Sequence, residues 1–349
     1  MKILIAHEIF YPEVSGGGEK IVLELAKGLL ERGHEVKIFT SGDPKIKQYE
    51  GIETVRLPVN RYLLSLSLPL ISKHTKDCDL VQISTGNLTF PAFYASRIHK
   101  KPSVCTAYHL FGPFWKDVKG PLIGTAFQKF EKSYLTRDYD AFVFMNRYTE
   151  KLGLDAGVNK GKAHLIHPGF DYEKYKPKKM KKEPFVLLVG NFAMNESMLR
   201  VKGTYNLIEA AKMLPETDFV IVGGGSGIEN LKKKSPNNVK FLGPMKFEDF
   251  AEYYNRALIF CHPSLSESFS LAILEAMAYG CSVVSAIDLG QKGIRIRVKD
   301  TEDIANGIKH LLNNTGKTIS MGRENMKIAK KFTWKKFIAD YEKLYQSLV

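Results

Sequence analysis

The sequence predicts an α/β protein built from two doubly wound domains, each a parallel sheet covered by helices. The chain has 349 residues, which is more than one hydrophobic core usually organises, so about two domains are expected. Short apolar runs alternate with helical stretches in both halves, and this alternation is typical of parallel sheets. A polar, basic segment at 172–182 without apolar periodicity separates the halves and is typical of an exposed linker.

The first half begins with a predicted strand, helix and second strand. Ile3–Ala6 is the first apolar run, helical spacing of apolar residues continues until Gly33, and Val36–Thr40 is the next run. Further strands are predicted at 80–83, 103–106 and 141–145. These elements form the N-terminal domain, which we assign to residues 1–171.

The second half repeats the pattern, and we assign its domain to residues 172–332. Its predicted strands are Phe185–Val189, Phe219–Val222, Val239–Leu242, Leu258–Cys261 and Val283–Ser285. Residues 333–349 follow as a separate C-terminal helix, with Trp334, Phe337, Tyr341 and Tyr345 on roughly one face. That apolar face requires a partner surface.

Composition excludes several classes of protein. With 44% hydrophobic and 25% charged residues, the chain resembles neither a disordered nor a fibrous protein. The longest apolar stretch, at 63–71, is interrupted by two serines and a proline, so no transmembrane helix is expected. The first residues lack the apolar core of a secretory signal. We therefore expect a cytoplasmic protein.

The cysteine spacing excludes two kinds of site, and the net charge favours one class of partner. The four cysteines lie far apart with no CxxC pair, which excludes a zinc knuckle and a thioredoxin-like site. The net charge of +14 favours anionic partners such as phosphates, anionic lipids or nucleic acid. The RGG or basic–aromatic pattern typical of RNA binding is missing, and an acidic pair follows a predicted strand, so we expect no nucleic-acid partner.

Ligands of open α/β sheets bind at the carboxyl ends of strands, so residues that follow the predicted strands are the first candidates. Gly16, Gly17 and Gly18 precede the first helix, where backbone N–H groups could meet a phosphate. The alternative is a tight turn that needs positive φ. The pattern is neither GxGxxG nor a Walker loop.

Other candidates follow later strands. His109 comes after the strand at 103–106; the alternative interpretation is a histidine bonded only to nearby backbone groups. In the second half, the residues that follow strands are Gly190, Asn191, Gly243, Pro244 and Met245. Since both halves carry such positions, we expect one cleft between the domains.

The segment from His262 to Gly280 carries the strongest local pattern, with two carboxylates, Glu267 and Glu275, eight residues apart. If Ser268 or Ser270 caps the helix and Gly280 ends it, Glu275 lies on its apolar, buried face. A carboxylate there needs hydrogen-bond donors, which sugar or ribose hydroxyls would provide. The alternative donors are a backbone N–H or a core arginine. N–H groups suited to a diphosphate are expected at Ser268, Phe269, Ser270 and Leu271.

Two DxD strings, Asp77–Asp79 and Asp138–Asp140, have the spacing that some transferases use to hold a divalent ion. Each stands directly before an apolar run. We therefore place both at the amino edge of a sheet, away from the expected cleft, and predict no metal site.

Together these motifs resemble the retaining, nucleotide-sugar-dependent glycosyltransferases of family 4, which have the GT-B fold of two Rossmann-like domains. The motifs that carry the resemblance are Glu267-x7-Glu275, the helix end at 276–280, the Gly16-Gly17-x-Glu19 turn, the stretch 30–36, Val189-Gly190, Lys202-Gly203, Pro168-Gly169 and the segment 332–337. The likeness covers nearly the whole chain. It implies that the C-terminal helix crosses back to the first domain.

The resemblance also implies roles for individual residues. Glu275 matches the carboxylate that binds the donor ribose, Glu267 the one that contacts the transferred sugar, and Lys202 the cation that neutralises the leaving diphosphate. Gly16–Gly18 would close over the phosphates, and His109 would contact the donor sugar. Asn191 stands where the family usually has an arginine, so Arg200 is the candidate substitute.

The implied reaction is metal-independent transfer from a UDP- or GDP-sugar with retention of configuration, without a protein nucleophile or further cofactor. The acceptor, a glycan, lipid or small molecule, is not identified by the sequence. Rival functions are a sugar-nucleotide epimerase or phosphorylase of the same fold, and a catalytically idle basic binding protein.

A peripheral contact with an anionic membrane, on its inner face, is a further hypothesis. Segments 60–76 and 111–132 mix Leu, Phe or Trp with Lys and Arg. The alternative is that their apolar residues face the core and their lysines keep the protein soluble.

Overall fold

The computed structural model describes residues 1–13, 16–175, 180–190, 196–225, 227–267 and 269–349. The described chain forms two compact units. The N-terminal unit comprises Met1–Leu110, Lys129–Gly169 and Phe332–Val349, and the C-terminal unit comprises Phe111–Gln128 and Phe170–Lys331. Among the described residues, no helix is long and apolar enough to cross a membrane.

The N-terminal unit contains an eight-stranded sheet with the order β3-β4-β2-β1-β5-β6-β7-β8. Its strands are β1 (Lys2–Ala6), β2 (Glu35–Ser41), β3 (Gln48–Tyr49), β4 (Ile52–Leu57), β5 (Leu80–Ser84), β6 (Ser103–Thr106), β7 (Ala141–Phe144) and β8 (Ala163–Leu165). The short β3 pairs antiparallel with β4, and the other neighbours pair parallel. The chain leaves β1 for β2 and later returns to place β5 on the other side of β1. The order therefore reverses between β1 and β5.

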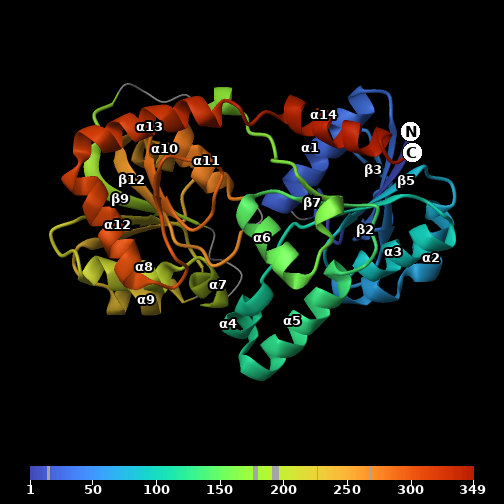
Figure 1. Cartoon of the computed structure of the whole chain (residues 1–349), viewed down its shortest axis with the longest axis horizontal. Helices are drawn as coiled ribbons and strands as arrows, with labels where there is room; N and C mark the ends of the chain where they lie inside the picture. The colour runs from blue at the N-terminus through green and yellow to red at the C-terminus, as the bar shows by residue number, and fades with distance from the viewer. Residues whose placement is uncertain (14–15, 176–179, 191–195, 226, 268) are drawn as a thin grey trace. The chain divides into compact units, whose positions relative to one another are not determined.

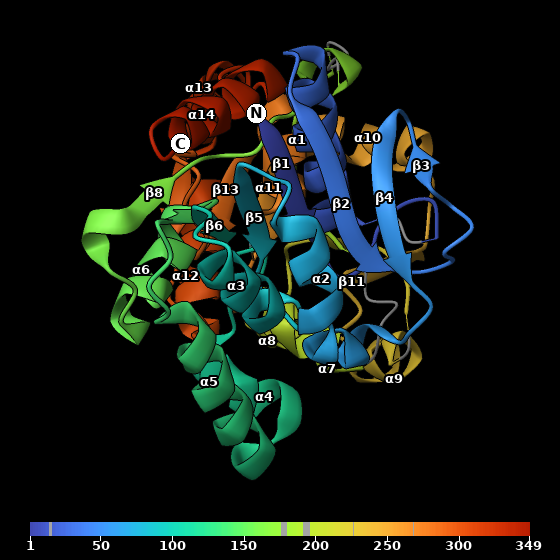
Figure 2. The ribbon, with the colours of Figure 1, turned by 90° about the vertical axis from the view of Figure 1, so that its right-hand side faces the viewer.

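Helices cover this sheet and complete its core. They are α1 (Gly17–Glu31), η1 (Arg61–Leu66), α2 (Leu68–Thr75), α3 (Thr89–Ile98), α6 (Arg147–Ala156), η3 (Lys160–Lys162) and α14 (Trp334–Gln346). Figure 2 shows α2 and α3 side by side. On α14, Phe337, Tyr341 and Tyr345 are fully buried, and the Tyr341 hydroxyl lies 2.9 Å from the Thr106 hydroxyl of β6. The amphipathic C-terminal helix thus packs within the N-terminal unit.

The C-terminal unit contains a six-stranded, fully parallel sheet with the order β11-β10-β9-β12-β13-β14. Its strands are β9 (Glu183–Val189), β10 (Phe219–Val222), β11 (Val239–Gly243), β12 (Ala257–His262), β13 (Ser282–Ser285) and β14 (Gly293–Arg295). Here the strand order reverses between β9 and β12.

Most helices of the C-terminal unit follow one of its strands along the chain, whereas η2, α4 and η4 precede the first strand (Figure 1). They are η2 (Gly112–Phe114), α4 (Trp115–Lys119), η4 (Tyr172–Tyr175), α7 (Glu196–Val201), α8 (Thr204–Lys212), α9 (Ile228–Lys234), α10 (Phe247–Arg256), α11 (Leu271–Ala278), α12 (Thr301–Asn313) and α13 (Thr315–Ala329). Helix α5 (Pro121–Leu135) begins in this unit and ends in the N-terminal one. Side chains of β9, β10, β12, α8 and α12 form the main core of the C-terminal unit.

The predicted fold class is confirmed: both units are doubly wound α/β sheets. Each strand predicted from an apolar run is present, with ends that differ from the prediction by two residues at most. The sequence pattern was sufficient to predict these strands, because strands of a buried parallel sheet are short, uninterrupted apolar runs in the sequence.

Candidate functional site

A cluster of polar side chains surrounds the loop after β12 in the C-terminal unit. Nζ of Lys202 lies 2.5 Å from Oε1 of Glu267. The same carboxylate oxygen lies 3.1 Å from both Nε2 of His262 and Oγ of Ser264. Ser270 joins through its Oγ, which lies 3.1 Å from Nε2 of His262. We call these five residues the Glu267 cluster.

The sheet topology explains why the Glu267 cluster is a candidate site. His262 is the last residue of β12, and β12 borders β9 where the strand order reverses. At such a point the connections leave the sheet in opposite directions, which opens a crevice at the carboxyl ends of the strands. The cluster therefore lies where this class of sheet binds ligands.

The charge of Glu267 is fixed by its neighbours. Burial alone would raise its pKa, but the ammonium group of Lys202 and the His262 hydrogen bond outweigh burial and hold the pKa well below its usual range. The carboxylate therefore stays ionised at neutral pH. An ionised Glu267 beside Lys202 can orient this lysine while accepting hydrogen bonds from a bound polyol.

Gly203 holds Lys202 against the loop after β12. Its φ of +67° lies in the left-handed region, and a Cβ built on it would lie 2.1 Å from the carbonyl oxygen of Pro263. Nearby, the N–H of Leu265 donates to the Val201 carbonyl at 2.7 Å. Only glycine permits both the conformation and this close backbone approach.

Ser270 differs from its predicted role as a helix cap. It occupies the position before α11, but its side chain makes no capping hydrogen bond, and its backbone has φ 71° and ψ 79°. A capping residue normally has an extended backbone. In the left-handed conformation the Ser270 hydroxyl instead contacts His262. Ser268, the other predicted cap, lies outside the described residues.

Glu275 lies on α11, one turn beyond the loop. The sequence pattern placed it on the buried face, whereas the structure leaves it half-buried while Leu274 and Ala278 are fully buried. The hydroxyl of Tyr254 donates to its Oε2 at 2.9 Å. A tyrosine hydroxyl, which was not among the donors expected from the sequence, thus donates to this carboxylate.

The tyrosines beside Glu275 remain protonated donors. Burial, and then the charge of Glu275, raise the pKa of Tyr254 well above its usual value. The same two causes raise the pKa of Tyr175, whose hydroxyl also bonds to Glu275. Two phenol groups therefore hold the side chain of Glu275 at the margin of the apolar helix face.

The other residues of this unit that the sequence predicts to bind the nucleotide sugar lie around the same edge of the sheet. Gly190 directly follows β9, and Gly243 ends β11 with a φ of +76°. Pro244 is exposed and Met245 half-buried. Phe269 is buried and Leu271, the first residue of α11, is half-buried.

Arg200, the predicted substitute for the usual arginine, lies in the last turn of helix α7. The guanidinium is placed over the ring of Tyr205, 5.1 Å from its centre, and the residue is exposed. Asn191, which stands where the family usually has that arginine, lies outside the described residues.

The N-terminal unit has its own polar cluster at the point where its strand order reverses. His7 follows β1 and Ser84 ends β5, and Nδ1 of His7 lies 2.7 Å from the Ser84 hydroxyl. Nε2 of His7 lies 3.8 Å from Oε1 of Glu19. Burial acts to raise the pKa of Glu19, but hydrogen bonding to His7 outweighs it and lowers that pKa.

Glycines 16 to 18 lie beside this second cluster, at the start of α1. None of the three has positive φ; Gly16, for example, has φ −146°. The alternative interpretation, a turn that requires positive φ, is therefore wrong. A Cβ on Gly17 would have no described atom within 4 Å, whereas one on Gly18 would lie 3.7 Å from the ring of Tyr108. His109 follows Tyr108 and is half-buried.

From the sequence, no role is assigned to several members of these clusters, although the segment that contains His262 and Ser264 is singled out. His262, Ser264 and His7 are polar residues at or just after a strand end, so the same strand-end rule could have selected them. Tyr254 and Tyr175 carried no such signal, because they reach Glu275 from α10 and η4 through the tertiary fold.

Both DxD strings lie at the amino edge of the N-terminal sheet, as predicted. Asp79 accepts the backbone N–H of Lys2 at 2.7 Å, and Asp140 accepts that of Ser103 at 2.9 Å. Asp138 is paired with Lys162. Within the described ranges, no group of three or more His, Cys, Asp or Glu side chains is arranged to hold a metal ion.

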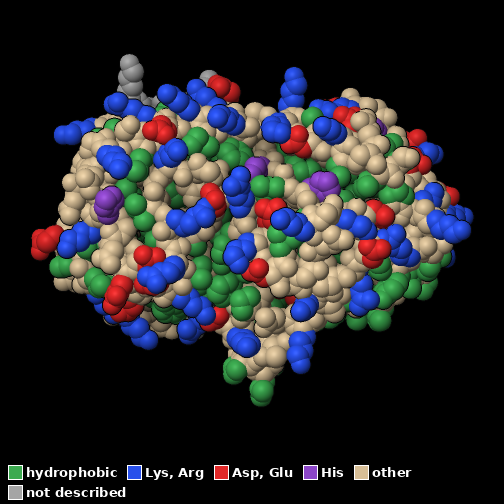
Figure 3. All heavy atoms as spheres, viewed as in Figure 1, with side chains coloured by type: hydrophobic (Ala, Val, Ile, Leu, Met, Phe, Trp, Pro, Cys, Tyr) green, Lys and Arg blue, Asp and Glu red, His purple; other side chains and the backbone are tan. Residues whose placement is uncertain are grey.

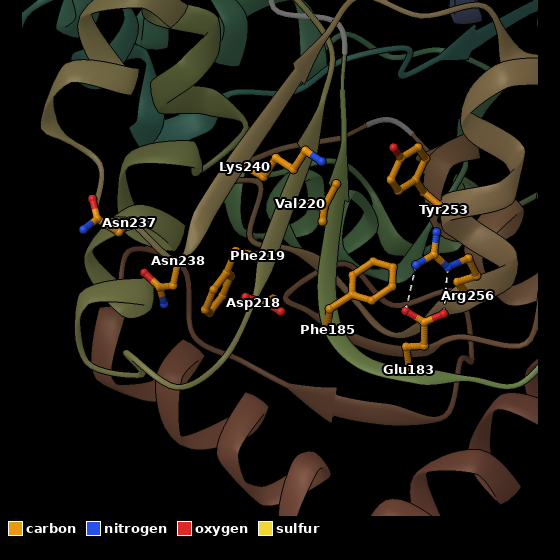
Figure 4. A pocket seen from close by; sticks show the side chains of 10 residues that line it. All are labelled: Glu183, Phe185, Asp218, Phe219, Val220, Asn237, Asn238, Lys240, Tyr253 and Arg256. Atoms are coloured by element: carbon orange, nitrogen blue, oxygen red, sulfur yellow. Dashed lines mark hydrogen bonds and ion pairs between the residues drawn. The ribbon is translucent and has the colours of Figure 1, made fainter.

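A cavity of about 380 Å³ lies at the opposite edge of the C-terminal sheet (Figure 4). Its lining includes Glu183 and Phe219, the first residues of β9 and β10. In Figure 4 the guanidinium of Arg256 faces the carboxylate of Glu183, with nitrogen–oxygen distances of 2.7 and 2.9 Å. Arg256 and Glu183 thus form an ion pair with each other. The cavity is at the amino ends of strands and does not belong to the candidate site.

Two family models match successive parts of the chain. Residues 15–174 match the family model described as Glycosyltransferase Family 4, and residues 183–314 match the one described as Glycosyl transferases group 1. An uncharacterised glycosyltransferase of Methanocaldococcus jannaschii is 25% identical over 100% of this chain and 99% of its own length.

Solved structures show the same fold. Sucrose-phosphate synthase from Thermosynechococcus elongatus superposes with a TM-score of 0.78 at 21% identity, covering 99% of this chain and 98% of that one. Anabaena HepE, solved in complex with UDP-glucose, superposes with a TM-score of 0.72 at 19% identity and full coverage of both chains. With both halves matched in order to glycosyltransferase families and the fold shared with GT-B enzymes, the chain belongs to the family 4 type of glycosyltransferases.

Proposed function

We propose that the protein transfers a sugar from a UDP- or GDP-sugar to a hydroxyl group of an acceptor, with retention of anomeric configuration and without a metal ion. The observation that carries this proposal is the Glu267 cluster, which joins a lysine and an ionised carboxylate at the carboxyl edge of the C-terminal sheet. HepE, which shares the fold, was solved with UDP-glucose, and this supports the choice of donor.

Lys202 is proposed to bind the diphosphate of the donor. As the bond to the sugar breaks, negative charge grows on the leaving phosphate, and a positioned cation stabilises this charge more in the transition state than in the ground state. Glu267 holds Nζ of Lys202 at 2.5 Å, so the ammonium group is already oriented. Such orientation replaces the positioning that a metal ion supplies in other enzymes.

Glu267 is proposed to contact the transferred sugar. Its pKa is held well below the usual range, so it accepts hydrogen bonds from sugar hydroxyls as a carboxylate. The reacting carbon gains positive charge in the transition state, which a nearby carboxylate favours. In this scheme the departing phosphate removes the proton of the acceptor, and no covalent sugar–protein bond forms.

Glu275 is proposed to bind the ribose of the nucleotide. Tyr254 fixes the carboxylate by its hydrogen bond at 2.9 Å, which leaves the ribose hydroxyls to donate to the same group. The N-terminal unit is proposed to contribute Gly16–Gly18 to the phosphates and His109 to the donor sugar. The acceptor is a glycan, a lipid or a small molecule.

The test is a transfer assay with a panel of radiolabelled UDP- and GDP-sugars and candidate acceptors, run with excess EDTA. We expect sugar transfer with stoichiometric release of nucleoside diphosphate, and NMR of the product should show the anomeric configuration of the donor. Lys202→Ala and Glu275→Gln should each lower kcat/KM by about 100-fold, as expected for the loss of a charged contact worth about 3 kcal/mol.

Matched variants control for charge and exposure. Lys240→Ala removes an exposed lysine at the amino edge of the same sheet, and Glu229→Gln removes an exposed carboxylate on α9; both should retain full activity. Near-wild-type turnover of Lys202→Ala would exclude the proposed site. Epimerised donor without transfer, or sugar release that consumes phosphate, would indicate one of the rival enzymes. Activity lost in EDTA and restored by Mg²⁺ or Mn²⁺ would refute metal independence.

A further inference from the structure

Helix α5 has apolar side chains on two sides. One side is buried against the protein, whereas the other is largely exposed, although the centre of the Phe127 ring lies 4.9 Å from that of Trp115 and the centre of the Phe130 ring 5.7 Å from that of Phe90. On the packed side, Gly124 is buried so closely against α4 that a Cβ would lie 2.5 Å from Cα of Lys116. Leu135 is buried in the N-terminal unit. At about 100° per residue, Gly124 and Leu135 lie on the same stripe of the helix. This stripe accounts for the packing of α5.

The other side of α5 is apolar and exposed. Leu122 is 87% exposed, Ile123 58%, Phe127 40% and Phe130 46%. Ala126 is exposed as well. At about 100° per residue these five positions share an arc of about 140°, opposite the packed stripe. We call them the α5 apolar face.

Single exposed apolar residues are normal on protein surfaces, whereas a contiguous group marks an interaction site. Of the fourteen large apolar side chains that are exposed in the described structure, Leu122, Ile123, Phe127 and Phe130 fall within nine residues of one helix. Segment 60–76 adds others, among them Leu63 and Leu66, although its Leu64 and Ile71 are buried. The idea that the apolar residues of both segments only face the core is therefore wrong for part of them.

Exposed lysines border the α5 apolar face. They are Lys116 and Lys119 on α4, and Lys129 and Lys132 on α5. Nζ of Lys119 lies 5.9 Å from the centre of the Phe127 ring, so basic and apolar groups are direct neighbours. In Figure 3 the end of the α4–α5 hairpin shows green apolar atoms with blue lysine side chains beside them.

The acidic residues of the same segment do not balance these lysines at the surface. Both carboxylate oxygens of Asp117 lie 2.7 Å from Nζ of Lys299. Glu131 is 2% exposed and lies on the packed side of α5. The exposed side of the hairpin is therefore apolar at its centre and cationic at its rim.

We propose that the α5 apolar face inserts into the surface of an anionic phospholipid bilayer, with the four lysines against the lipid headgroups. An interfacial helix of this kind has an apolar face buried at the acyl boundary and basic residues that attract anionic lipid. A second copy of the chain fits less well, because a symmetric contact through this face would bring the two sets of lysines together. The inference does not depend on the proposed sugar transfer.

The test is co-sedimentation of the full chain with vesicles, which needs no enzymatic activity. Vesicles of equal phosphatidylglycerol and phosphatidylcholine should bind the protein at low salt, and vesicles of phosphatidylcholine alone should bind it far less. High NaCl should weaken binding because it screens the lysines. Leu122→Ser/Ile123→Ser should reduce the partition coefficient by about 100-fold, at about tenfold for each apolar side chain.

Two further variants separate the roles of charge and apolar area. Lys129→Ala/Lys132→Ala should reduce binding by about 30-fold, at about fivefold for each lysine near an anionic surface. The matched controls are Lys233→Ala/Lys234→Ala on α9, which removes two exposed lysines, and Met213→Ser, which removes a side chain that is 50% exposed. Both controls should bind like the wild type. Circular dichroism checks that every variant is folded.

Three results would overturn the proposal. One is absence of binding to anionic vesicles at low salt, and another is equal loss of binding in the controls and in the α5 variants. The third is a dimer in light scattering that Leu122→Ser/Ile123→Ser converts to a monomer, because the face would then serve contact between two copies. A failed transfer assay with intact vesicle binding would contradict the proposed function alone.

Discussion

Replacing Gly203 by alanine tests whether the loop after β12 carries the active site. Gly203 separates Lys202 from α8, and its backbone is in the left-handed region at φ +67°. A Cβ there would lie 2.1 Å from the carbonyl oxygen of Pro263, which directly follows His262. The substitution adds one methyl group and removes no polar contact of the Glu267 cluster.

The structure gives the size of the two effects of Gly203→Ala, which are backbone strain and displacement of the Pro263 carbonyl. A non-glycine residue in the left-handed region costs about 1–2 kcal/mol. The Pro263 carbonyl must also move by about 0.9 Å, because Cβ atoms essentially never come closer than 3.0 Å to such an atom. A displacement of about 1 Å at reacting groups lowers the rate by about 100-fold. We therefore expect both a loss of stability and a loss of about 100-fold in kcat.

The matched control is Gly33→Ala. Gly33 has φ +82°, but a Cβ on it would meet no described atom within 4 Å. This variant should lose about 1–2 kcal/mol from backbone strain alone and retain its kcat. Thermal unfolding by circular dichroism measures the strain, and transfer at saturating donor measures the displacement.

Full activity of Gly203→Ala, with a loss of stability no larger than that of Gly33→Ala, would refute the reasoning. It would mean that the contact between Gly203 and Pro263 does not position the Glu267 cluster for catalysis. Equal loss of activity in both variants would indicate global destabilisation as the cause.

Two further predictions concern stability. Lys202 and His262 hold the pKa of Glu267 well below 4.5, so the stability that Glu267 contributes relative to Glu267→Gln should be fully present above about pH 5 and should fall as the pH is lowered from there. Urea unfolding of both proteins as a function of pH measures this difference in stability. A difference that grows on acidification would contradict the predicted sign. Gly28→Ala should lower the free energy of unfolding by about 1–3 kcal/mol, because a Cβ would lie 2.1 Å from Cδ1 of Ile338 on α14. Part of this loss should disappear in an Ile338→Ala background. Purely additive losses of stability in the double variant would argue against the contact.

The sequence by itself determined the fold class and the order of strands along the chain. Runs such as Ile3–Ala6 and Phe219–Val222 are apolar without interruption because parallel strands are buried on both faces. Its local patterns also selected Glu267 and Ser270, and the family resemblance selected Lys202; the structure brings the three residues into one cluster with His262. Strand-end position and helix spacing are local properties, so a local pattern is sufficient to find them.

The tertiary structure alone decided which side chains meet. His7 bonds to Ser84 across 77 positions of sequence, and Lys202 reaches Glu267 across 65. These distances depend on where the strand order reverses, which no local pattern encodes. Ser270 showed the same limit, because the residue suited to a helix cap has a left-handed backbone and contacts His262 instead.

Helix α5 shows why periodicity cannot assign burial. Gly124 and Leu122 both belong to an apolar helix pattern, yet Gly124 is buried against α4 and Leu122 is 87% exposed. The period of a helix reports which residues share a face, and it contains no information about which face a neighbouring element covers. The packing of α4 against Gly124 decides that one side is buried, whereas Leu122 and Ile123 on the other side stay exposed.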